Sequence, residues 1–525
     1  MPRRGTRRSL LPLGFLGLAL GGMALGRCGS QAAEPPIDLG SRLELMVDDY
    51  LIDQTSGGAR LVLHHPTPRE VVLVHDAPWE GSGCNYHSVF QDGDLYRMYY
   101  HGWQLTVAGG KLNTPHDLFT CYAESRDGIH WRKPELGRIA FDGSTKNNIV
   151  LASGELGPLV IDAGHIAMFK DENPACAPDA RYKAMVLSRK PHGLLPFKSA
   201  DALRWLPMSD KPVITDGAFD SQNLAFWDAA RGEYRAYWRI FTAGVADGTT
   251  WKPAGHRAIR TATSPDYLHW SKPVDLTYVD SPSEHLYTNQ IKPYYRAPHL
   301  LVGFPTRYVE RGWSPSMEAL PELEHRRLRA AASPRFGTAL TEGLLMTSRD
   351  GHTFHRWNEA FLRPGPERAG AWNYGHQYIA WHLVETAAAL AGAGRELSLY
   401  ATEDYWTGHS SQLRRYTLRI DGFVSIQAPM RGGQLVTKPL VFQGGRLLLN
   451  FATSAAGGIR VEIQDAEGQP FAGFALADSH EVFGDALDRP VTWKNGPDLK
   501  PLAGKPVRLR FELKDADLFA FRFAP

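Results

Sequence analysis

The chain has little cysteine and no recognisable metal-binding cluster. Only four of its 525 residues are cysteine, no two form a CxxC pair, and an odd number of them, the three cysteines Cys84, Cys121 and Cys176, lie beyond residue 32. An odd number of cysteines argues against a disulfide framework. The 20 histidines are scattered, and no group of His, Cys, Asp or Glu has the spacing of zinc ligands. The sequence therefore specifies neither a cofactor nor a metal site.

An excess of charge of one sign is also absent. The chain carries 58 Lys and Arg residues against 56 Asp and Glu residues, and five of the arginines lie within the first 32 residues. Without those 32 residues the balance becomes 53 basic against 56 acidic residues, a net charge of −3. A chain this close to neutrality has no general attraction for nucleic acid or for an anionic membrane surface, so we expect neither as a partner.

The N-terminus has the three-part layout of a secretory signal peptide. Four arginines within residues 3–8 precede an apolar run, residues 10–25, and Ser30-Gln31-Ala32 is a small-x-small cleavage site. The apolar run is too short and too rich in glycine for a membrane span. Residues 6–11 also resemble a twin-arginine signal. We predict that residues 1–32 are a signal peptide and that the protein is secreted or periplasmic, with no membrane span.

One short segment recurs along the chain. Ser125-Arg-Asp127-Gly-Ile-His-Trp131 shares its Ser-x-Asp-x-x-x-Trp spacing with residues 199–205 and 264–270. In residues 348–354 the tryptophan is delayed to Trp357, and residues 418–423 keep only the turn and an aromatic residue. Each copy follows a short apolar run, which predicts a strand that ends in a tight turn held by its Ser and Asp side chains.

A hairpin pattern, two strand-like runs separated by a turn, precedes each copy. The paired runs are 86–90 with 95–100, 166–169 with 182–187, 224–227 with 234–238, 291–295 with 300–304, and 378–383 with 397–402. Five units of hairpin, third strand and turn predict an all-β fold, a five-bladed β-propeller. The alternative is an ordinary all-β sandwich in which the turns are similar by chance.

The length of the chain favours two domains. We predict that residues 36–428 form the propeller and that residues 433–525 form a C-terminal β-sandwich, because runs in the latter alternate apolar and polar residues with period two. Two further strand-like runs, residues 43–47 and 61–63, precede the first unit. We expect them to complete the last blade and so to close the ring.

Three carboxylates lie just before the first strand of a unit, in what we call the lead-in segments. Because the innermost strands of a propeller line a central channel, the lead-in segments should form a funnel at one end of it. Cleavage of a glycosidic bond needs two carboxyl groups, a protonated acid and a base or nucleophile. We predict Glu284 as the acid, Asp220 as the base or nucleophile, and Asp162 as a group that orients the sugar or tunes the acid. The alternative for each is a turn or capping carboxylate.

The lead-in segments also carry aromatic and amide side chains where core packing would favour Val or Ile. Sugar rings pack on aromatic rings, and their hydroxyls bond to Asn, Gln, His and Arg. The candidate substrate-binding residues are Tyr86, His87, His165, Asn223, Tyr287, Asn289, Gln290, Arg307, Trp372, Tyr374 and His376. Arg307 could bind the carboxylate of an acidic sugar, or be a surface arginine. Residues 310–336 break the strand pattern and predict a helical insertion at the rim.

These features resemble the five-bladed furanosidase families that include invertases, levanases and arabinanases, and exported bacterial proteins described as glycosyl hydrolases of that kind. The resemblance covers nearly the whole mature chain in its architecture. Those families carry Asn-Asp-Pro-like, Arg-Asp-Pro-like and Glu-Cys-like motifs. Here Phe219-Asp220-Ser221 and Ser283-Glu284-His285 are positional counterparts of two of them, whereas Asn85-Tyr86-His87 lacks the first-blade Asp.

The resemblance implies a secreted glycoside hydrolase that acts on a poly- or oligosaccharide through two carboxylates. The recurring turns also resemble the Asp-boxes of sialidases, but those enzymes have six blades and an arginine triad, and the chain has five units. The alternatives are therefore a non-catalytic glycan-binding propeller and a sialidase-like enzyme. A fold shared by many functions does not by itself decide among them.

Export can be tested on the mature N-terminus. Because the cleavage site is Ser30-Gln31-Ala32, N-terminal sequencing of protein recovered from the periplasm or the medium should begin at or near Ala33. A cytoplasmic protein that retains Met1 would contradict the prediction.

Overall fold

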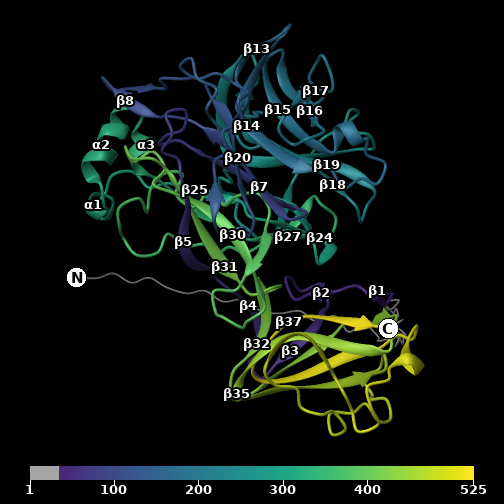
Figure 1. The fold of residues 1–525 in the computed structure, drawn as a ribbon. Helices are drawn as coiled ribbons and strands as arrows, with labels where there is room; N and C mark the ends of the chain where they lie inside the picture. The colour runs from purple at the N-terminus through teal and green to yellow at the C-terminus, as the bar shows by residue number, and fades with distance from the viewer. Residues whose placement is uncertain (1–34) are drawn as a thin grey trace, which may run out of the picture.

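The computed structural model describes residues 35–525, and the predicted signal peptide lies outside this range. Most of the structure consists of β-strands (Figure 1). Five sheets surround a common axis in the upper part of the figure, and a further sheet, which contains the C-terminus, lies below them. The predicted five-bladed propeller is confirmed.

Each of the first three blades contains four antiparallel strands in sequence order. The first blade consists of β6 (Asn85–Asp92), β7 (Leu95–Gly102), β10 (Phe119–Ser125) and β11 (Trp131–Arg132). The second consists of β14 (Leu159–Lys170), β15 (Tyr182–Lys190), β16 (His192–Ser199) and β17 (Leu206–Pro207). The third consists of β18 (Leu224–Asp228), β19 (Glu233–Ala246), β20 (Trp251–Ser264) and β21 (Val274–Asp275). Short strands extend these sheets or their loops: β8 (Thr106–Ala108), β9 (Lys111–Asn113), β12 (Ile149–Ala152) and β13 (Gly154–Leu156).

The fourth and fifth blades each include a strand from outside the segment of the chain that forms the rest of the blade. The fourth is β23 (Lys292–Tyr294), β24 (Ala297–Gly303), β27 (Met346–Ser348) and β28 (Thr353–Arg356), with β22 (Thr277–Val279) parallel to β28. The fifth is β29 (Val384–Ala387), β30 (Arg395–Glu403), β31 (Gln412–Leu418) and the N-terminal strand β5 (Thr67–Val74). Strand β5 pairs antiparallel with β31 and so closes the ring.

The expectation that an N-terminal strand closes the ring is confirmed, but the prediction that residues 43–47 and 61–63 provide it is wrong. Residues 44–45 form β2, which pairs with β37 (Arg508–Ala524), and residues 60–63 form β4, which pairs with β32 (Val424–Ala428). Period-two alternation shows that a run can be a strand but not which sheet edge receives it. Pro68 and the charged residues after it weaken the strand pattern of β5.

The lower sheet is built from both ends of the described chain. It contains β2 (Glu44–Leu45), β3 (Ile52–Ser56), β4 (Arg60–Leu63), β32, β33 (Gly433–Thr437), β35 (Arg446–Gln464), β36 (Asp485–Pro490) and β37, and β1 (Ile37–Gly40) pairs parallel with β34 (Leu440–Phe442). The long strands β35 and β37 pair with each other over most of their lengths, and their alternate residues form one apolar core. The division into domains and the sandwich architecture stay predictions.

The recurring segment makes the same turn in successive blades. In the first blade, Ser125 Oγ accepts a hydrogen bond from the amide of Gly128, and Asp127 Oδ1 accepts bonds of 2.8 Å from the amides of Ile129 and His130. Equivalent bonds form in the copies at 264–269 and 348–353. The fourth position has a positive φ in each full copy, as in Gly128 at 74°, which explains why two of the copies have glycine there.

Three of these turns each accept a hydrogen bond from a tyrosine of the preceding blade. The hydroxyl of Tyr99, on the second strand of the first blade, donates to the carbonyl of Ala202 in the second blade's turn at 2.8 Å. Tyr237 makes the same bond to Gly351, and Tyr400 to Gly128. These tyrosines are fully buried. The turn therefore joins each of these blades to its neighbour.

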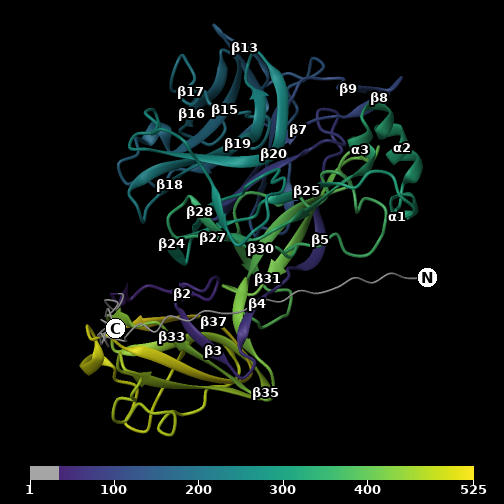
Figure 2. The same ribbon diagram turned by 180° about the vertical axis from the view of Figure 1, so that it is seen from behind.

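The predicted helical insertion is confirmed, and it lies beside the propeller (Figures 1 and 2). Between β25 (Thr306–Glu310) and β26 (Ala339–Gly343) the chain forms α1 (Pro315–Ala319), α2 (Leu323–Ala332) and α3 (Pro334–Thr338), while the 3-10 turns η1 (Pro178–Ala180) and η2 (Lys500–Leu502) lie elsewhere. Buried Arg329 of α2 donates to the carbonyl of Trp406 at 2.7 Å. The insertion is thus anchored to a loop of the fifth blade.

The tyrosine bonds between blades can be tested by removing one hydroxyl. Tyr237→Phe leaves the buried carbonyl of Gly351 without its donor and should lower the free energy of unfolding by about 1–3 kcal/mol in urea titrations. Tyr278→Phe is the matched control, because the buried hydroxyl of Tyr278 has no partner among the described residues. Equal losses in both variants would contradict a specific role for the bond.

Candidate functional site

The structure brings lead-in segments of several blades together at one end of the channel, which we call the funnel end. The Tyr287 hydroxyl lies 2.8 Å from that of Tyr374, and the Tyr287 ring stacks on Tyr378 at 5.2 Å. Tyr378 in turn stacks on Tyr86, whose ring lies 5.8 Å from His165. Four predicted substrate-binding residues, Tyr86, His165, Tyr287 and Tyr374, thus belong to one aromatic cluster.

Asp220 joins this cluster through a buried arginine. Arg239, on β19, is only 3% exposed, and its Nη1 lies 3.0 Å from Oδ1 of Asp220. Its Nη2 donates to the carbonyl of Tyr287, and its guanidinium carbon lies 4.1 Å from the centre of the Tyr287 ring. The Asp220 side chain remains 36% exposed. The arginine therefore anchors an accessible carboxylate beside the tyrosines.

The surroundings of Tyr287 and Tyr374 shift the pKa values of their hydroxyl groups in opposite directions. Burial raises the pKa of Tyr287, but the guanidinium groups of Arg239 and Arg257 outweigh burial and hold that pKa below its usual range. Burial and the proximity of Tyr287 raise the pKa of Tyr374. These opposite shifts favour Tyr374 as the donor in the hydrogen bond between the two hydroxyl groups.

Two further arginines, Arg257 and Arg335, lie beside tyrosine rings at this end of the fold. The guanidinium carbon of Arg257, on β20, lies 4.5 Å from the centre of the Tyr308 ring, and that of Arg335, on α3, lies 5.8 Å from that of Tyr374. Buried Nε of Arg257 and buried Nη1 of Arg335 have no hydrogen-bond partner among residues 35–525. The cluster therefore has an excess of positive charge with unused donors.

Asp162 lies in the same end of the fold but its oxygens are occupied. Oδ2 accepts bonds from Nε and Nη2 of Arg189 at 3.0 and 2.6 Å, and Oδ1 accepts from the amide of Gly164. Burial raises the pKa of Asp162, but His165 and Arg189 outweigh it, so that the pKa lies far below its usual range. Asp162 is a charged anchor that also orients His165, 3.1 Å away.

Glu284 is held in a separate cluster of charges. Its oxygens lie 2.8 Å from Nε of Arg307 and 2.9 Å from Nη2 of Arg356, which belongs to an outer strand of the fourth blade. Arg307 also donates to Glu342 and to the carbonyl of Asn358, so its nitrogens are already used. In the part of the chain that the structure describes, no hydrogen bond or ion pair joins Glu284 to Asp220.

Several other predicted residues link the innermost strands to one another. Gln290 Nε2 donates to Gln222 Oε1 at 2.8 Å, and Gln222 donates to the carbonyl of Tyr86 at 2.9 Å. Asn223 donates to the carbonyls of His165 and Phe219. The two glutamines lie across the axis of the propeller, where they separate the funnel end from the opposite end.

Of the remaining predicted residues, His87, Asn289 and His376 are buried and Trp372 is half-buried. Nε2 of His87 lies 3.1 Å from that of His75, and Asn289 Oδ1 accepts from a backbone amide two residues on. The indole of Trp372 donates to a backbone carbonyl, and burial lowers the pKa of His376 to about 4. These contacts are internal to the fold.

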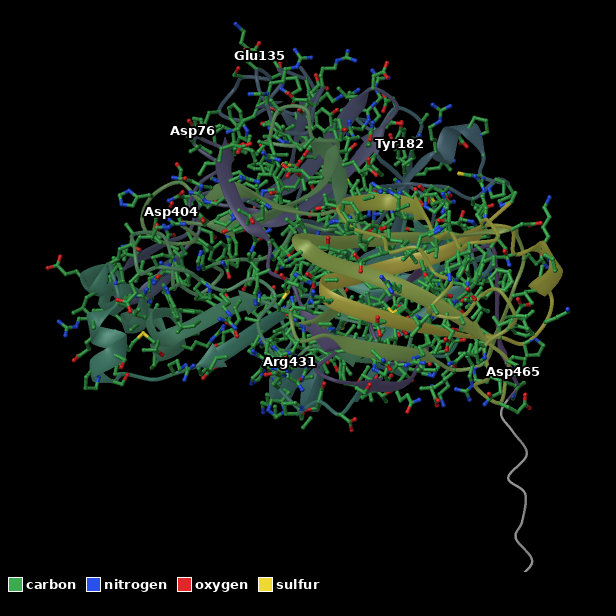
Figure 3. The ribbon with its side chains drawn as sticks, turned by 90° about the horizontal axis from the view of Figure 1, so that it is seen from below. Asp76, Glu135, Tyr182, Asp404, Arg431 and Asp465 are labelled. Atoms are coloured by element: carbon green, nitrogen blue, oxygen red, sulfur yellow. The ribbon has the colours of Figure 1, made fainter. Side chains whose placement is uncertain are left out.

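Arg239, Arg257 and Asp404, which lie at this end of the fold, were not predicted from the sequence. Arg239 and Arg257 lie within second and third strands rather than in lead-in segments, and an arginine between Trp238 and Ile240 in an apolar run was the available signal. Burial and the nearby carboxylates of Glu322 and Glu403 raise the pKa of Asp404. Figure 3 shows Asp404 on the same side of the molecule as the helical insertion.

Comparisons with known proteins give remote matches. No protein-family model matches the chain. Uncharacterized proteins of Mycobacterium tuberculosis, from strains CDC 1551 / Oshkosh and ATCC 25618 / H37Rv, are each 33% identical over 151 residues, 29% of this chain. The match spans 40% of the length of those relatives.

Several solved structures similar to this chain are those of carbohydrate-active enzymes. An N-acetylgalactosamine deacetylase from F. plautii is 10% identical, with a TM-score of 0.41, over 69% of this chain and 96% of that one. The catalytic domain of an α-L-arabinofuranosidase from Coprinopsis cinerea is 8% identical, with a TM-score of 0.40, over 68% and 97% of the two chains. A glycosyl hydrolase from Bacteroides ovatus is 12% identical, with a TM-score of 0.38, over 71% and 96%.

Two further properties of the described residues concern the predicted environment of the protein. Their three cysteines are free, and two of these are buried. Within the same residues no helix has the length and apolarity required to cross a membrane.

The polarised tyrosine pair predicts an unusual tyrosine titration. The ultraviolet difference spectrum of the wild type minus Tyr287→Phe should show a tyrosinate that forms below pH 10, the ordinary tyrosine value, because Arg239 and Arg257 favour the phenolate. Arg257→Met should move this titration to higher pH. A difference spectrum that titrates at or above pH 10 in the wild type would contradict the proposed polarisation.

Proposed function

We propose that the chain is a secreted glycoside hydrolase that binds an acidic poly- or oligosaccharide at the funnel end and uses Asp220 as its base or nucleophile. The observation that carries this proposal is the exposed carboxylate of Asp220, held by buried Arg239 at the edge of an aromatic cluster. A base or nucleophile acts in its charged form, which a neighbouring guanidinium group favours in general.

The aromatic cluster supplies the surface on which a sugar ring would lie. Tyr287, Tyr374 and Tyr86 come from three different blades, and their hydroxyl groups and ring faces offer both hydrogen bonds and apolar contact. Sugars use both kinds of contact, because their rings have apolar C–H faces and polar edges. The sugar would therefore lie beside Asp220.

The excess positive charge supports an acidic sugar. Arg257 and Arg335 keep unused donor nitrogens beside the tyrosines, and a carboxylate or sulfate group on the sugar would satisfy them. Buried donors without partners cost free energy, so a ligand that completes their hydrogen bonds gains affinity. The previously expected clamp, Arg307, is committed to Glu284 and Glu342.

The reaction also needs a proton donor, for which two carboxyl groups are candidates. Glu284, predicted from the sequence, would have to leave the guanidinium groups of Arg307 and Arg356 before it could act. Asp404 precedes Tyr405, whose ring lies 6.0 Å from that of Tyr374, and burial beside Glu322 and Glu403 raises the pKa of Asp404, as a general acid requires. Asp162, which is tied to Arg189, would orient His165 towards the sugar.

A non-catalytic glycan-binding propeller is the second candidate function. The guanidinium bonds that occupy Asp162 and Glu284 favour it, because they leave Asp220 as the accessible carboxylate among the three predicted ones. Binding needs only the tyrosines and arginines, whereas hydrolysis also needs Asp220 to act chemically. A variant of Asp220 therefore separates the two functions.

The test is hydrolysis of a panel of acidic and neutral plant and algal polysaccharides by the mature chain, measured as released reducing ends. Asp220→Asn should lower turnover by at least about a hundredfold, the low end of what a positioned acid or base supplies, and should leave folding and sugar binding intact. Glu135→Gln, at an exposed position, is the control and should retain activity. Binding without hydrolysis of any polysaccharide by the wild type would favour the glycan-binding function.

The proton donor is identified in the same assay. If Asp404 is the acid, Asp404→Asn should lower turnover at least about a hundredfold and Glu284→Gln should have a small effect. The reverse result would assign the role to Glu284. Normal activity in both variants would contradict a carboxylic acid at either position.

A further inference from the structure

A cavity opens at the end of the propeller opposite the funnel, which we call the far end. It has a volume of about 790 Å³. Its walls come from the ends of the innermost strands β6, β18 and β23 and from the residues around the start of β29. Gln290 lines this cavity, and its Nε2 donates to Gln222, which in turn donates to the carbonyl of Tyr86 in the aromatic cluster.

Two residues that line the far-end cavity each carry a buried polar atom without a hydrogen-bond partner in the described chain. Gln290, 2% exposed, uses its Nε2 for bonds to Gln222 and to the carbonyl of Ile379, and its Oε1 has no hydrogen-bond partner within residues 35–525. His382, 6% exposed, likewise has an Nε2 without a partner there. Because buried polar groups are nearly always hydrogen-bonded, these atoms indicate a place for a polar ligand.

A lysine supplies positive charge to the same cavity. Lys292 is half-buried on β23, and its ammonium nitrogen lies 5.9 Å from the centre of the Trp381 ring. In the described chain its amine has no carboxylate oxygen within 4.0 Å, although the cavity is also lined by the carboxylates of Asp94, Glu172 and Glu385. Burial lowers the pKa of this amine, an effect that a bound anion would offset.

The walls of the cavity suit a sugar-like molecule. Trp227 and Phe90 present aromatic surface, and the volume falls within the range of small-molecule sites. Aromatic faces bind the C–H faces of sugar rings. An amide oxygen accepts hydrogen bonds from hydroxyl groups, and a neutral imidazole nitrogen can accept or donate them.

We propose that the far-end cavity is a second ligand site, and that it takes a small polyhydroxylated carboxylate such as a hexuronate. The carboxylate would pair with Lys292, the hydroxyl groups would bond to Gln290 Oε1 and His382 Nε2, and the ring would lie against Trp227. This proposal does not depend on catalysis at the funnel end, because the two sites share no lining residue other than the glutamine partition between them.

The test is saturation-transfer NMR of galacturonate with the mature chain carrying Arg257→Met, which disables the arginine cluster of the funnel end. In this background Lys292→Met should weaken binding at least about tenfold, the order of one charge-assisted hydrogen bond. Lys272→Met is the matched control, because Lys272 is exposed and lies outside the cavity, and it should have no effect. Absence of binding in the Arg257→Met background, or binding that is unchanged by Lys292→Met, would overturn the proposal.

Competition and a second variant define what the site recognises. Trp227→Ala should also weaken galacturonate binding, and thermal melting of both variants shows that they remain folded. Galactose should compete poorly because it lacks the carboxylate, and sulfate should compete poorly because it lacks the ring. Equal competition by galactose would overturn the role of Lys292, and equal competition by sulfate would overturn the role of the polyol.

Discussion

The hydrogen bond from a buried tyrosine to the turn of the next blade is the contact on which this ring depends. Tyr99, Tyr237 and Tyr400 each donate to the carbonyl at the left-handed position of a Ser-x-Asp turn. The turn must therefore have one conformation, and the repeated Ser and Asp side chains hold it in that conformation. These bonds join the first blade to the second, the third to the fourth and the fifth to the first, and the pairing of β5 with β31 closes the fifth blade.

The axis of the propeller is divided rather than open. Gln222 and Gln290 bond to each other and to backbone carbonyls of neighbouring innermost strands, so polar side chains cross the axis. On one side lie Asp220, Arg239 and the tyrosines, and on the other lies the cavity with Lys292. One scaffold thus presents two chemically different ends: a carboxylate held by arginine at one end, and at the other a lysine that forms no ion pair within residues 35–525.

The sequence predicted the number of blades because the Ser-x-Asp turn is a local pattern with a local cause that recurs in four blades, and the fifth blade has the same hairpin pattern. It also predicted that lead-in residues such as Tyr86, Tyr287 and Tyr374 converge, because propeller topology brings the starts of the innermost strands together. It could not predict the partner of each charge. Glu284 and Tyr287 lie three residues apart, yet one faces Arg356 of an outer strand and the other faces the cluster.

The central claim is that a sugar lies beside Asp220 at the funnel end, and a crystal structure of Asp220→Asn with the oligosaccharide that the wild type cleaves tests it most directly. The account predicts a glycosidic bond within about 3 Å of, or one water molecule away from, the side chain at position 220. It also predicts an acidic group on Arg257 or Arg335. A substrate chain bound only in the far-end cavity, or away from position 220, would contradict the account.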